Sequence, residues 1–358
     1  MPHTLQAEGL TRFGAAVLES LGVPPTDAHL LADSLVVAEL WGHSSHGMLR
    51  LPWYVDRLRS GVMTSVSKPE IVMDGGAITV MDGHHGIGQV LTAKAVELGI
   101  QRAREHGISA VGVRNSNHFG TAAYFTRMAA NEGCVALLAT NASPAMAPWG
   151  GRVKSIGTNP WSIAAPGGRR GVAVMDIANT AVARGKIYLA AERGVEIPNN
   201  WAADANGVPT TNAADAIHGL ILPMAGHKGY VISFMMDVLA GVLTGSHFGS
   251  SVAGPYEAKR TSGCGHLLIT IDVKSMMPLA EFEQRMEALI DEVKAIPTAH
   301  GIEEIFFPGE LEDRNTTRLL ETGISLADTT WRSLVKLSTE TSTALPEPFF
   351  AQNQRTAT

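Results

Sequence analysis

The feature that most constrains the fold is an alternation of two hydrophobic periods in the first half of the chain. Short apolar runs at residues 77–81, 110–113 and 135–139 have the length and composition of strands. Between them, residues 89–105 and 119–131 carry apolar side chains at helical spacing. Strands that alternate with helices predict an α/β architecture, in which helices cover a sheet.

The residues before this region have a helical pattern. Apolar positions recur at helical spacing over 5–21 and 28–40. The turn between these helices contains glycine and two prolines, and Thr26 is placed to act as the N-cap of the second helix. A third helix is predicted over 48–60, with Gly61 just past its end, where a left-handed glycine commonly closes a helix.

The second half of the chain is less regular. Residues 141–212 are rich in Gly, Pro, Asn and Thr, which is typical of loops between strands, with short apolar runs at 161–165 and 172–177. After them the pattern predicts a helix over 230–243, a strand over 266–271, a helix over 279–296, helical sequence over 311–338 and a poorly ordered tail beyond Thr339. We expect a helical segment over 1–75, an α/β core with the binding site over 76–310, and C-terminal helices over 311–358 that pack with the first segment.

Composition and charge bound the class of protein. Of the 358 residues, 45% are hydrophobic and only 17% are charged, so the chain can bury a large core and is expected to form two or three packed units. The formal net charge is −6, and no run of basic residues is present. Neither nucleic acid nor an anionic membrane is therefore an expected partner.

The cysteines and the N-terminus indicate where the protein works. Cys134 and Cys264 are far apart and belong to no metal-binding motif, so neither a disulfide framework nor a cysteine metal site is expected. The first residues lack a basic segment followed by an apolar one, and no uncharged stretch reaches the length of a membrane span. We expect a soluble protein of the reducing cytoplasm.

Residues 43–50 are the first candidate reaction centre. They place His43, His46, two serines that include Ser45, and Arg50 where the chain leaves one predicted helix and enters the next. Histidine is the side chain whose ordinary pKa allows proton transfer near neutrality, and arginine matches a planar carboxylate. The cluster indicates proton transfer on a small acid.

Two further segments carry candidate chemistry. His118 lies near the start of a predicted helix, where the helix dipole disfavours a charged imidazolium and favours a neutral, polarising or proton-accepting ring. The alternative is that Asn117 caps the helix and His118 only packs in the turn. His227 and Lys228 precede an apolar helix, where backbone N–H groups and a cation can hold phosphate, unless they are solvated residues of a glycine turn.

The common nucleotide-binding signatures are absent from the sequence. Residues 83–88 approach a dinucleotide fingerprint, but its third glycine would fall at position 91, which is Leu91. A strand-to-helix turn whose glycines supply positive φ is the favoured interpretation. No Walker-type loop, His-Glu-x-x-His or Cys-x-x-Cys occurs. A nicotinamide cofactor would therefore need a site other than a Rossmann fingerprint.

Two other classes of protein remain open from the residues alone. The 13 histidines, with His84 next to His85, permit a metal-dependent hydrolase. No pair of candidate ligands has helical metal spacing, however, and few carboxylates accompany the histidines, so no metal site is expected. A non-catalytic binding protein is the other alternative, and it predicts no change in NAD(P)H fluorescence on mixing.

Taken together, six segments resemble the second malate/L-lactate dehydrogenase family, whose members include ureidoglycolate and sulfolactate dehydrogenases, 2,3-diketogulonate reductase and piperideine-2-carboxylate reductase. The segments occur in the family's order and at its spacing over nearly the whole chain: 45–47 with Arg50, 115–120, 157–160, 176–186, 226–229 and 308–310. The resemblance implies a homodimeric oxidoreductase that uses NAD or NADP and acts on a small 2-hydroxy or 2-oxo acid. It also implies a mixed-sheet, non-Rossmann α/β core with a helical part formed by both termini.

The resemblance also implies roles for individual residues. His46 resembles the acid/base, oriented by Ser45, while Arg50 and Thr158 resemble contacts of the substrate carboxylate. His118 resembles a second catalytic or nicotinamide-side residue, and in some members it is regarded as the proton acceptor. The residues that resemble the family's cofactor contacts are His118, Thr140, Asp176, Ile177, Ala178, Lys186, His227, Lys228, Pro308, Gly309 and Glu310.

The chain departs from the family's patterns at two places. Imine-reducing members carry Ala-Asn-Gly-Asp, whose acidic residue assists the histidine, but residues 183–186 here read Ala-Arg-Gly-Lys. A lysine such as Lys186 cannot orient an imidazole as a carboxylate does, which favours reduction of an oxoacid over reduction of a cyclic imine such as piperideine- or pyrroline-2-carboxylate. The second departure is Gly263, where many relatives have asparagine, so a local contact is in doubt there.

Overall fold

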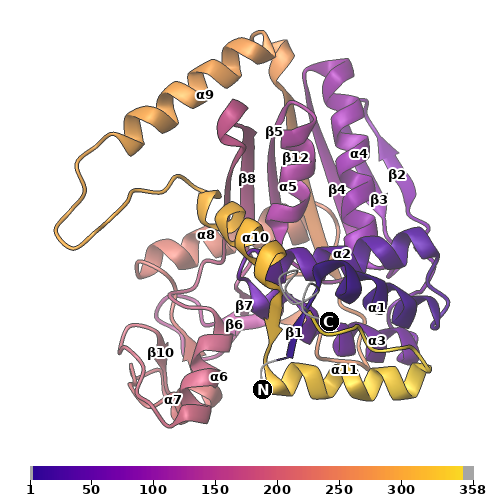
Figure 1. The fold of residues 1–358 in the computed structure, drawn as a ribbon, viewed down its shortest axis with the longest axis vertical. Helices are drawn as coiled ribbons and strands as arrows, with labels where there is room; N and C mark the ends of the chain where they lie inside the picture. Colours follow the sequence, from indigo (N-terminus) through magenta and orange to yellow (C-terminus); the bar gives the residue numbers. More distant parts are fainter. Residues whose placement is uncertain (1–2, 350–358) are drawn as a thin grey trace, which may run out of the picture.

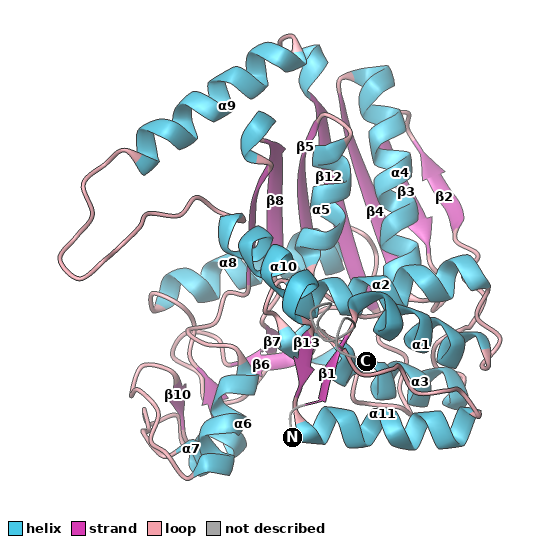
Figure 2. Cartoon of the chain, viewed as in Figure 1, coloured by secondary structure: helices cyan, strands magenta, loops and turns pink. Residues whose placement is uncertain are grey.

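The computed structural model describes residues 3–349. Its centre is a seven-stranded sheet in the order β2-β3-β4-β12-β5-β8-β9 (Figures 1 and 2). The strands are β2 (Glu70–Asp74), β3 (Ile78–Asp82), β4 (Ile108–Ser116), β5 (Cys134–Thr140), β8 (Trp161–Pro166), β9 (Val172–Ile177) and β12 (Cys264–Asp272). Within this sheet β3 and β4 run parallel, and the other neighbouring pairs are antiparallel. The α/β class and the mixed sheet are confirmed.

Two helices cover one face of the sheet and explain its parallel pair. Helix α4 (Gly88–His106) connects β3 to β4, and α5 (Ala122–Asn131) connects β4 to β5. Both lie on the same side of the sheet in Figure 1. Their apolar sides pack on alternate strand residues to form a buried core that includes Val96, Phe125 and Leu268. This layer holds the segment between β4 and α5, which carries His118, in a fixed position.

The helical part combines both ends of the described chain. It contains α1 (Ala7–Glu19), α2 (Pro25–Leu40), α3 (Leu51–Ser60), α10 (Glu310–Thr322) and α11 (Asp328–Thr341). A single core joins Leu10 and Leu35 to Leu334 and Leu337. Strand β1 (His3–Leu5) pairs antiparallel with β13 (Ile324–Leu326). The first and last described segments therefore stabilise each other.

A third group of elements lies at the opposite end of the sheet strands from helix α9 (Leu279–Lys294), as Figure 1 shows. Besides α9 and several short 3₁₀ helices, the remaining elements are β6 (Pro144–Met146), β7 (Ile156–Gly157), α6 (Arg184–Arg193), β10 (Ala202–Ala203), α7 (Ala213–His218), β11 (Leu220–Ile221), α8 (His227–Asp237) and a π-helix (Val238–Val242). Helices α6 and α7 share a small apolar core of their own. Within residues 3–349, no helix is long and apolar enough to cross a membrane.

Several local predictions need correction. Helix α2 begins at Pro25 with Pro24 in the cap position, so Thr26 is not its N-cap; proline suits the first turn because its φ is already helical. Helix α3 begins at Leu51 rather than 48, because two short 3₁₀ helices precede it. Gly61 closes α3 with φ of 78°, as predicted.

The turn at residues 83–88 also differs from its prediction. His84 and His85 adopt positive φ, at 47° and 60°, whereas the glycines at positions 83, 86 and 88 do not. Gly88 is needed for a different reason: a Cβ there would overlap the carbonyl oxygens of Asn117 and His118. Asn117 is not an N-cap, because α5 begins only at Ala122.

The irregular regions contain more structure than their composition suggests. Helix α6 lies within residues 141–212, where we expected loops; its period is weak because only Ile187 and Ala190 are buried. At the C-terminus α11 continues to Thr341, and the chain returns to β1, where the Phe349 N–H donates to the Thr4 carbonyl. Residues 350–358 of the predicted tail lie outside the described residues.

Candidate active site

The loop that carries His46 lies between α2 and α3 and consists of two 3₁₀ helices, Ser44–His46 and Met48–Arg50. The buried carboxylate of Glu39 holds it in place by accepting a hydrogen bond of 2.9 Å from the Met48 N–H. Gly47 is required because a Cβ there would overlap the Glu39 side chain. Burial raises the pKa of Glu39. The loop is therefore a rigid connection, anchored from α2.

The structure places His46 beside His118. Their ring centroids are 5.8 Å apart and the ring planes differ by 14°. Ser45 Oγ lies 3.0 Å from His46 Nδ1. Burial, followed by the nearby cation of Arg50, lowers the pKa of His46 to about 3 and holds the pKa of His118 well below its ordinary value. Both imidazoles are thus neutral at working pH.

The hydrogen bonds of His118 fix the position of its proton. The Gly120 N–H donates to Nδ1 of His118 at 3.2 Å, and the Tyr54 hydroxyl lies 2.7 Å from the same nitrogen. A backbone N–H can only donate, so Nδ1 is an acceptor and the neutral ring carries its proton on Nε2. Tyr54 is fully buried, and burial raises its pKa to about 12, so its hydroxyl stays protonated and donates.

Arg57 and Asn117 support the segment that carries His118. The buried Arg57 guanidinium donates to Asn117 Oδ1 at 2.9 Å. The amide of Asn117 donates to the carbonyl oxygens of Gly86 and His85 at 2.7 and 3.0 Å. Asn117 therefore links α3 to the turn before α4. No local sequence signal indicates this role.

Arg50 presents a cation next to the two imidazoles. Its Nε donates to the Ser45 carbonyl at 2.7 Å, and its guanidinium carbon lies 4.2 Å from the centroid of the Trp53 ring. Among the described residues, its two terminal nitrogens have no hydrogen-bond partner, so they can bind a carboxylate through both N–H pairs. His43 makes a different contact from His46: its Nε2 lies 3.2 Å from Glu312 Oε1 and connects the loop to α10.

Asn179, which sequence reasoning missed, brings three predicted segments together. Its N–H donates to the Thr158 carbonyl at 3.1 Å, and its carbonyl accepts from the Met224 N–H at 3.0 Å. Its side-chain amide donates to the Asn159 carbonyl at 2.7 Å. The turn with Thr158, the end of β9 with Ile177, and the chain leading to α8 therefore lie side by side. Ile177 is half-buried, and the neighbouring Ala178 is exposed.

The N-terminus of α8 has the chemistry that a dinucleotide needs. Gly226 occupies the cap position with φ of 65°, and no side chain caps the helix. His227 and Lys228 are exposed in the first turn. The Gly229 N–H donates to the Met224 carbonyl, which leaves the N–H groups of His227 and Lys228 for a ligand. These two groups, the positive end of the helix dipole and the lysine together suit a phosphate group. The residues present at this helix end fit the phosphates of NAD or NADP.

Other predicted cofactor residues use their side chains within the protein. Asp176 caps α5 by accepting from the Ala123 N–H at 2.8 Å, and burial raises its pKa. The Thr140 hydroxyl donates to the Gly265 carbonyl at 3.1 Å and lies 2.8 Å from His266 Nδ1. The Thr140 side chain therefore holds the end of β5, and the Asp176 side chain holds the end of β9.

The segment with Pro308, Gly309 and Glu310 lies beside β9. The Pro308 carbonyl accepts from the Val174 N–H at 3.0 Å, and Gly309 has φ of 97°. Glu310 lies 2.7 Å from Lys294 and 2.7 Å from Arg314. Lys186 is exposed in the first turn of α6. The structure thus brings Ser45, His46, Arg50 and His118 together and places the predicted cofactor segments around the ends of β9, α6 and α8.

Fold and site define an α/β protein with two neutral imidazoles beside an arginine and with a helix end suited to a dinucleotide. The chain belongs to the malate/L-lactate dehydrogenase family, whose model matches residues 5–335. It is therefore an oxidoreductase that depends on NAD or NADP, which confirms the predicted enzyme class and cofactor.

Individual relatives agree with this assignment over most of their length. The chain is 40% identical over 263 residues to (2R)-3-sulfolactate dehydrogenase (NADP(+)) of Chromohalobacter salexigens, covering 73% of this chain and 78% of that protein. It is 33% identical over 317 residues to ureidoglycolate dehydrogenase (NAD(+)) of Escherichia coli K12, covering 88% and 90%. The structure of sulfolactate dehydrogenase from Methanocaldococcus jannaschii aligns with a TM-score of 0.90 at 36% identity, covering 96% of this chain and 98% of that one. The fold is the same.

Proposed function

We propose that the protein transfers a hydride between the nicotinamide of NAD or NADP and C2 of a small 2-hydroxy or 2-oxo acid, such as malate, lactate, ureidoglycolate or sulfolactate. The observation that carries the proposal is the pair of near-parallel neutral imidazoles, His46 and His118, next to the Arg50 guanidinium. The cofactor supplies the hydride carrier, and the side chains bind the acid and manage its proton.

His46 is the acid/base in this proposal. If its Nδ1–H donates to Ser45 Oγ, 3.0 Å away, Nε2 has a free lone pair that can take the hydroxyl proton of the substrate. The Arg50 cation contributes to the low pKa of His46. A substrate carboxylate bound to Arg50 offsets that cation, so substrate binding raises the pKa of His46, while burial, the larger cause of the lowered pKa, remains.

His118 has a complementary role, as a hydrogen-bond donor. Its Nδ1 already accepts from Gly120 and Tyr54, so its Nε2–H can donate to the substrate oxygen but cannot remove a proton from it. A donor in this position stabilises the charge that develops on that oxygen. We infer that His46 performs the proton transfer and that Tyr54 positions His118.

For the cofactor, we propose that His227 and Lys228 hold a phosphate group at the start of α8. Residues 176–178 lie next to the Thr158 turn through Asn179, and this supports a cofactor path along the end of β9. We propose that Thr158 also contacts the substrate carboxylate, as the resemblance to the family implies. Lys186 and residues 308–310 complete the proposed lining of the cofactor site. Thr140, Asp176 and Glu310 contribute indirectly, because their side chains hold the backbone that lines this site.

The test is a panel of acids assayed with each reduced cofactor. Pyruvate, oxaloacetate, sulfopyruvate, a sugar-derived 2-oxo acid and cyclic imines are mixed with NADH or NADPH, and the nicotinamide absorbance is followed. We expect turnover with at least one 2-oxo acid and little or none with the imines. Absence of turnover with every oxoacid would refute the proposal, and turnover only with imines would assign the protein to the imine-reducing branch instead.

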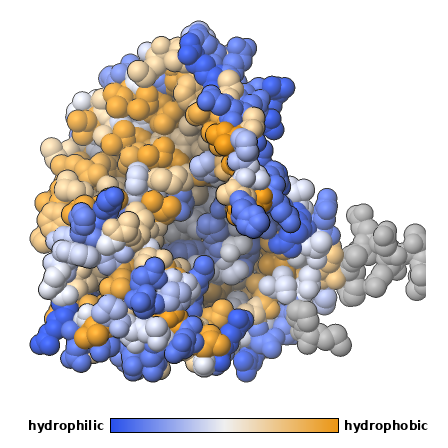
Figure 3. All heavy atoms as spheres, turned by 90° about the vertical axis from the view of Figure 1, so that its left-hand side faces the viewer, coloured by the Kyte–Doolittle hydropathy of each residue, from blue (hydrophilic) through white to orange (hydrophobic). Residues whose placement is uncertain are grey.

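We also propose that two copies of the chain associate through α8 and the π-helix that follows it. Beyond the first turn of α8, the exposed side chains of this stretch are apolar: Val231, Phe234, Met235, Val242 and Leu243. Figure 3 shows broad hydrophobic areas on the side of the molecule where α8 lies in Figure 1. An apolar surface of this kind is typical of a subunit interface. Sedimentation should give the mass of a dimer, and Phe234→Glu should shift it to that of a monomer.

The proposed location is the cytoplasm. Cys134 and Cys264 are both free and buried, and burial raises the pKa of each thiol to about 11. Thiols in this state are slow to react, and they fit a reducing compartment. Fractionation of cells that express the full chain tests this, and recovery in an exported fraction would contradict it.

A further inference from the structure

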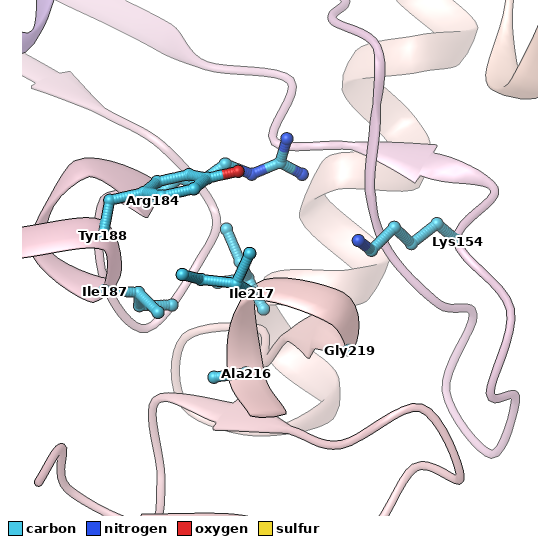
Figure 4. Close-up of a pocket in the computed structure, with 8 residues that line it drawn as sticks. Lys154, Arg184, Ile187, Tyr188, Ala216, Ile217 and Gly219 are labelled. Atoms are coloured by element: carbon cyan, nitrogen blue, oxygen red, sulfur yellow. The ribbon is translucent and has the colours of Figure 1, made fainter. Parts of the chain in front are cut away.

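A second pair of cations lies close to the loop that carries His46. Lys154 belongs to the segment before β7, and Arg184 is the first residue of α6. Both line one hollow, together with Ile187, Tyr188 and Ile217. Figure 4 shows the ammonium of Lys154 and the guanidinium of Arg184 directed into the same space from opposite walls. The hollow is thus bounded by two positive charges that come from distant parts of the sequence.

These charges have no counter-ion in the protein. Among residues 3–349, neither Lys154 nor Arg184 forms an ion pair or a side-chain hydrogen bond, and no Asp or Glu lines the hollow. Both side chains are half-buried. Burial, followed by the charge of Arg184, lowers the pKa of Lys154. Two partly desolvated cations side by side repel each other, and a bound anion would relieve that repulsion.

The hollow adjoins the candidate active site. A Cβ placed on Gly185 would lie 3.9 Å from Ser45 Cβ, so the first turn of α6 contacts the loop that carries His46. Arg184 is also close enough to Arg50 to lower its pKa, after the larger effect of burial. Arg184 therefore links the two sites, because it shares the hollow with Lys154 and also lies near Arg50.

We propose that Lys154 and Arg184 bind a second anionic group of the substrate, at the end distant from the carboxylate held by Arg50. This inference rests on the proposed function and narrows its substrate class to 2-oxo and 2-hydroxy acids with a distal carboxylate or sulfonate. Monoanionic acids such as pyruvate lack that group. A phosphate of the cofactor has the same chemistry, so the experiment must separate the two sources.

The kinetic test compares two acids in matched variants. We expect the wild type to prefer oxaloacetate to pyruvate. Lys154→Gln and Arg184→Gln should each lower kcat/KM for oxaloacetate roughly 10- to 100-fold, because each removes a charged hydrogen bond, and should change the value for pyruvate less than about threefold. Arg193→Gln is the control, because Arg193 is exposed at the other end of the same helix. It should leave both values unchanged.

Two results would overturn the proposal. One is an equal loss of kcat/KM for oxaloacetate and pyruvate. The other is a raised KM for NADPH with unchanged discrimination between the acids, which would assign the two cations to a cofactor phosphate.

A binding measurement keeps the subsite testable without turnover. Succinate and butyrate have the same chain length, but only succinate carries two carboxylates. We expect succinate to raise the melting temperature more than butyrate does in the wild type and in Arg193→Gln, and to lose this advantage in Arg184→Gln. If succinate still raises the melting temperature of Arg184→Gln more than butyrate does, the proposed subsite is wrong. If no acid is turned over, the proposed function fails while this assay still decides the subsite.

Discussion

Exchanging each active-site histidine for glutamine separates a proton acceptor from a hydrogen-bond donor. The glutamine amide presents an N–H close to the position of imidazole Nε2, but it cannot take up a proton. If His46 is the base, His46→Gln should be as slow as His46→Ala, with a loss of roughly 10²–10⁴-fold in kcat. If His118 is only a donor, His118→Gln should keep most of the activity that His118→Ala loses.

The structure indicates how much each substitution of His118 should lower the rate. Loss of the Nε2–H donor in His118→Ala should cost roughly 10²–10³-fold, the usual effect of removing one donor to a developing oxyanion. In His118→Gln the donor remains, but the 2.7 Å contact between Tyr54 and the ring is lost. A buried hydrogen bond contributes about 1 kcal/mol, so His118→Gln should run at roughly a fifth to a tenth of the wild-type rate.

The assay is steady-state kcat with the best acid of the panel, with cofactor binding followed by NAD(P)H fluorescence as the control for folding. All four variants should bind cofactor about as well as the wild type. An active His46→Gln together with a His118→Gln as slow as His118→Ala would refute the assignment, because it would make His118 the proton acceptor.

Three further predictions follow from the same geometry. Arg50→Lys should raise KM for the acid more than it lowers kcat, because lysine lacks the bidentate fork; an unchanged KM would make Arg50 structural. Because the pKa of His46 is lowered to about 3, kcat/KM for hydroxy-acid oxidation should stay level as the pH falls through 6.5, and a drop centred on 6.5 in the wild type would contradict this. His266 is buried with its pKa lowered to about 3, so the unfolded state binds more protons between pH 3 and 6.5. The free energy of unfolding should therefore fall by about 1.4 kcal/mol per pH unit below 6.5 for this residue; in urea titrations His266→Gln should weaken that pH dependence, and an unchanged slope would contradict it.

Much of the α/β core could be predicted, because the hydrophobic patterns that indicate its strands and helices are local in the sequence. The apolar runs that became β4, β5, β8 and β9 have strand period and length, and the helices between them bury one apolar side. The candidate reaction centre was also visible, because His46 and Arg50 are only four residues apart and lie on one rigid loop. Local spacing therefore predicted strands of the sheet and the part of the candidate site that contains His46 and Arg50.

The rest depends on contacts between distant residues, which periodicity does not reveal. Strand β12 lies between β4 and β5, although it follows them by more than a hundred residues. Tyr54 contacts His118 across 64 positions, and this contact decides which nitrogen of His118 carries the proton. Asn179 contacts residues from two other segments, and nothing in its neighbouring sequence distinguishes it from a loop asparagine.

Helix α6 was missed for a different physical reason. Only two of its side chains are buried, so its hydrophobic period is weak, and its composition resembles that of the loops around it. Its first turn nevertheless carries Arg184 beside the loop that carries His46. The departure at residues 183–186 was visible in the sequence, but the position of Arg184 opposite Lys154 required the structure.

The most direct test of the central claim is the fate of a deuterium label. Reduced cofactor in which both hydrogens at C4 of the nicotinamide are deuterium is incubated with the preferred 2-oxo acid, and the product is examined by mass spectrometry and NMR. We expect one deuterium at C2 of the resulting hydroxy acid, formed by the wild type and far more slowly by His46→Gln. Product without deuterium at C2, or label transfer at the wild-type rate in His46→Gln, would contradict it.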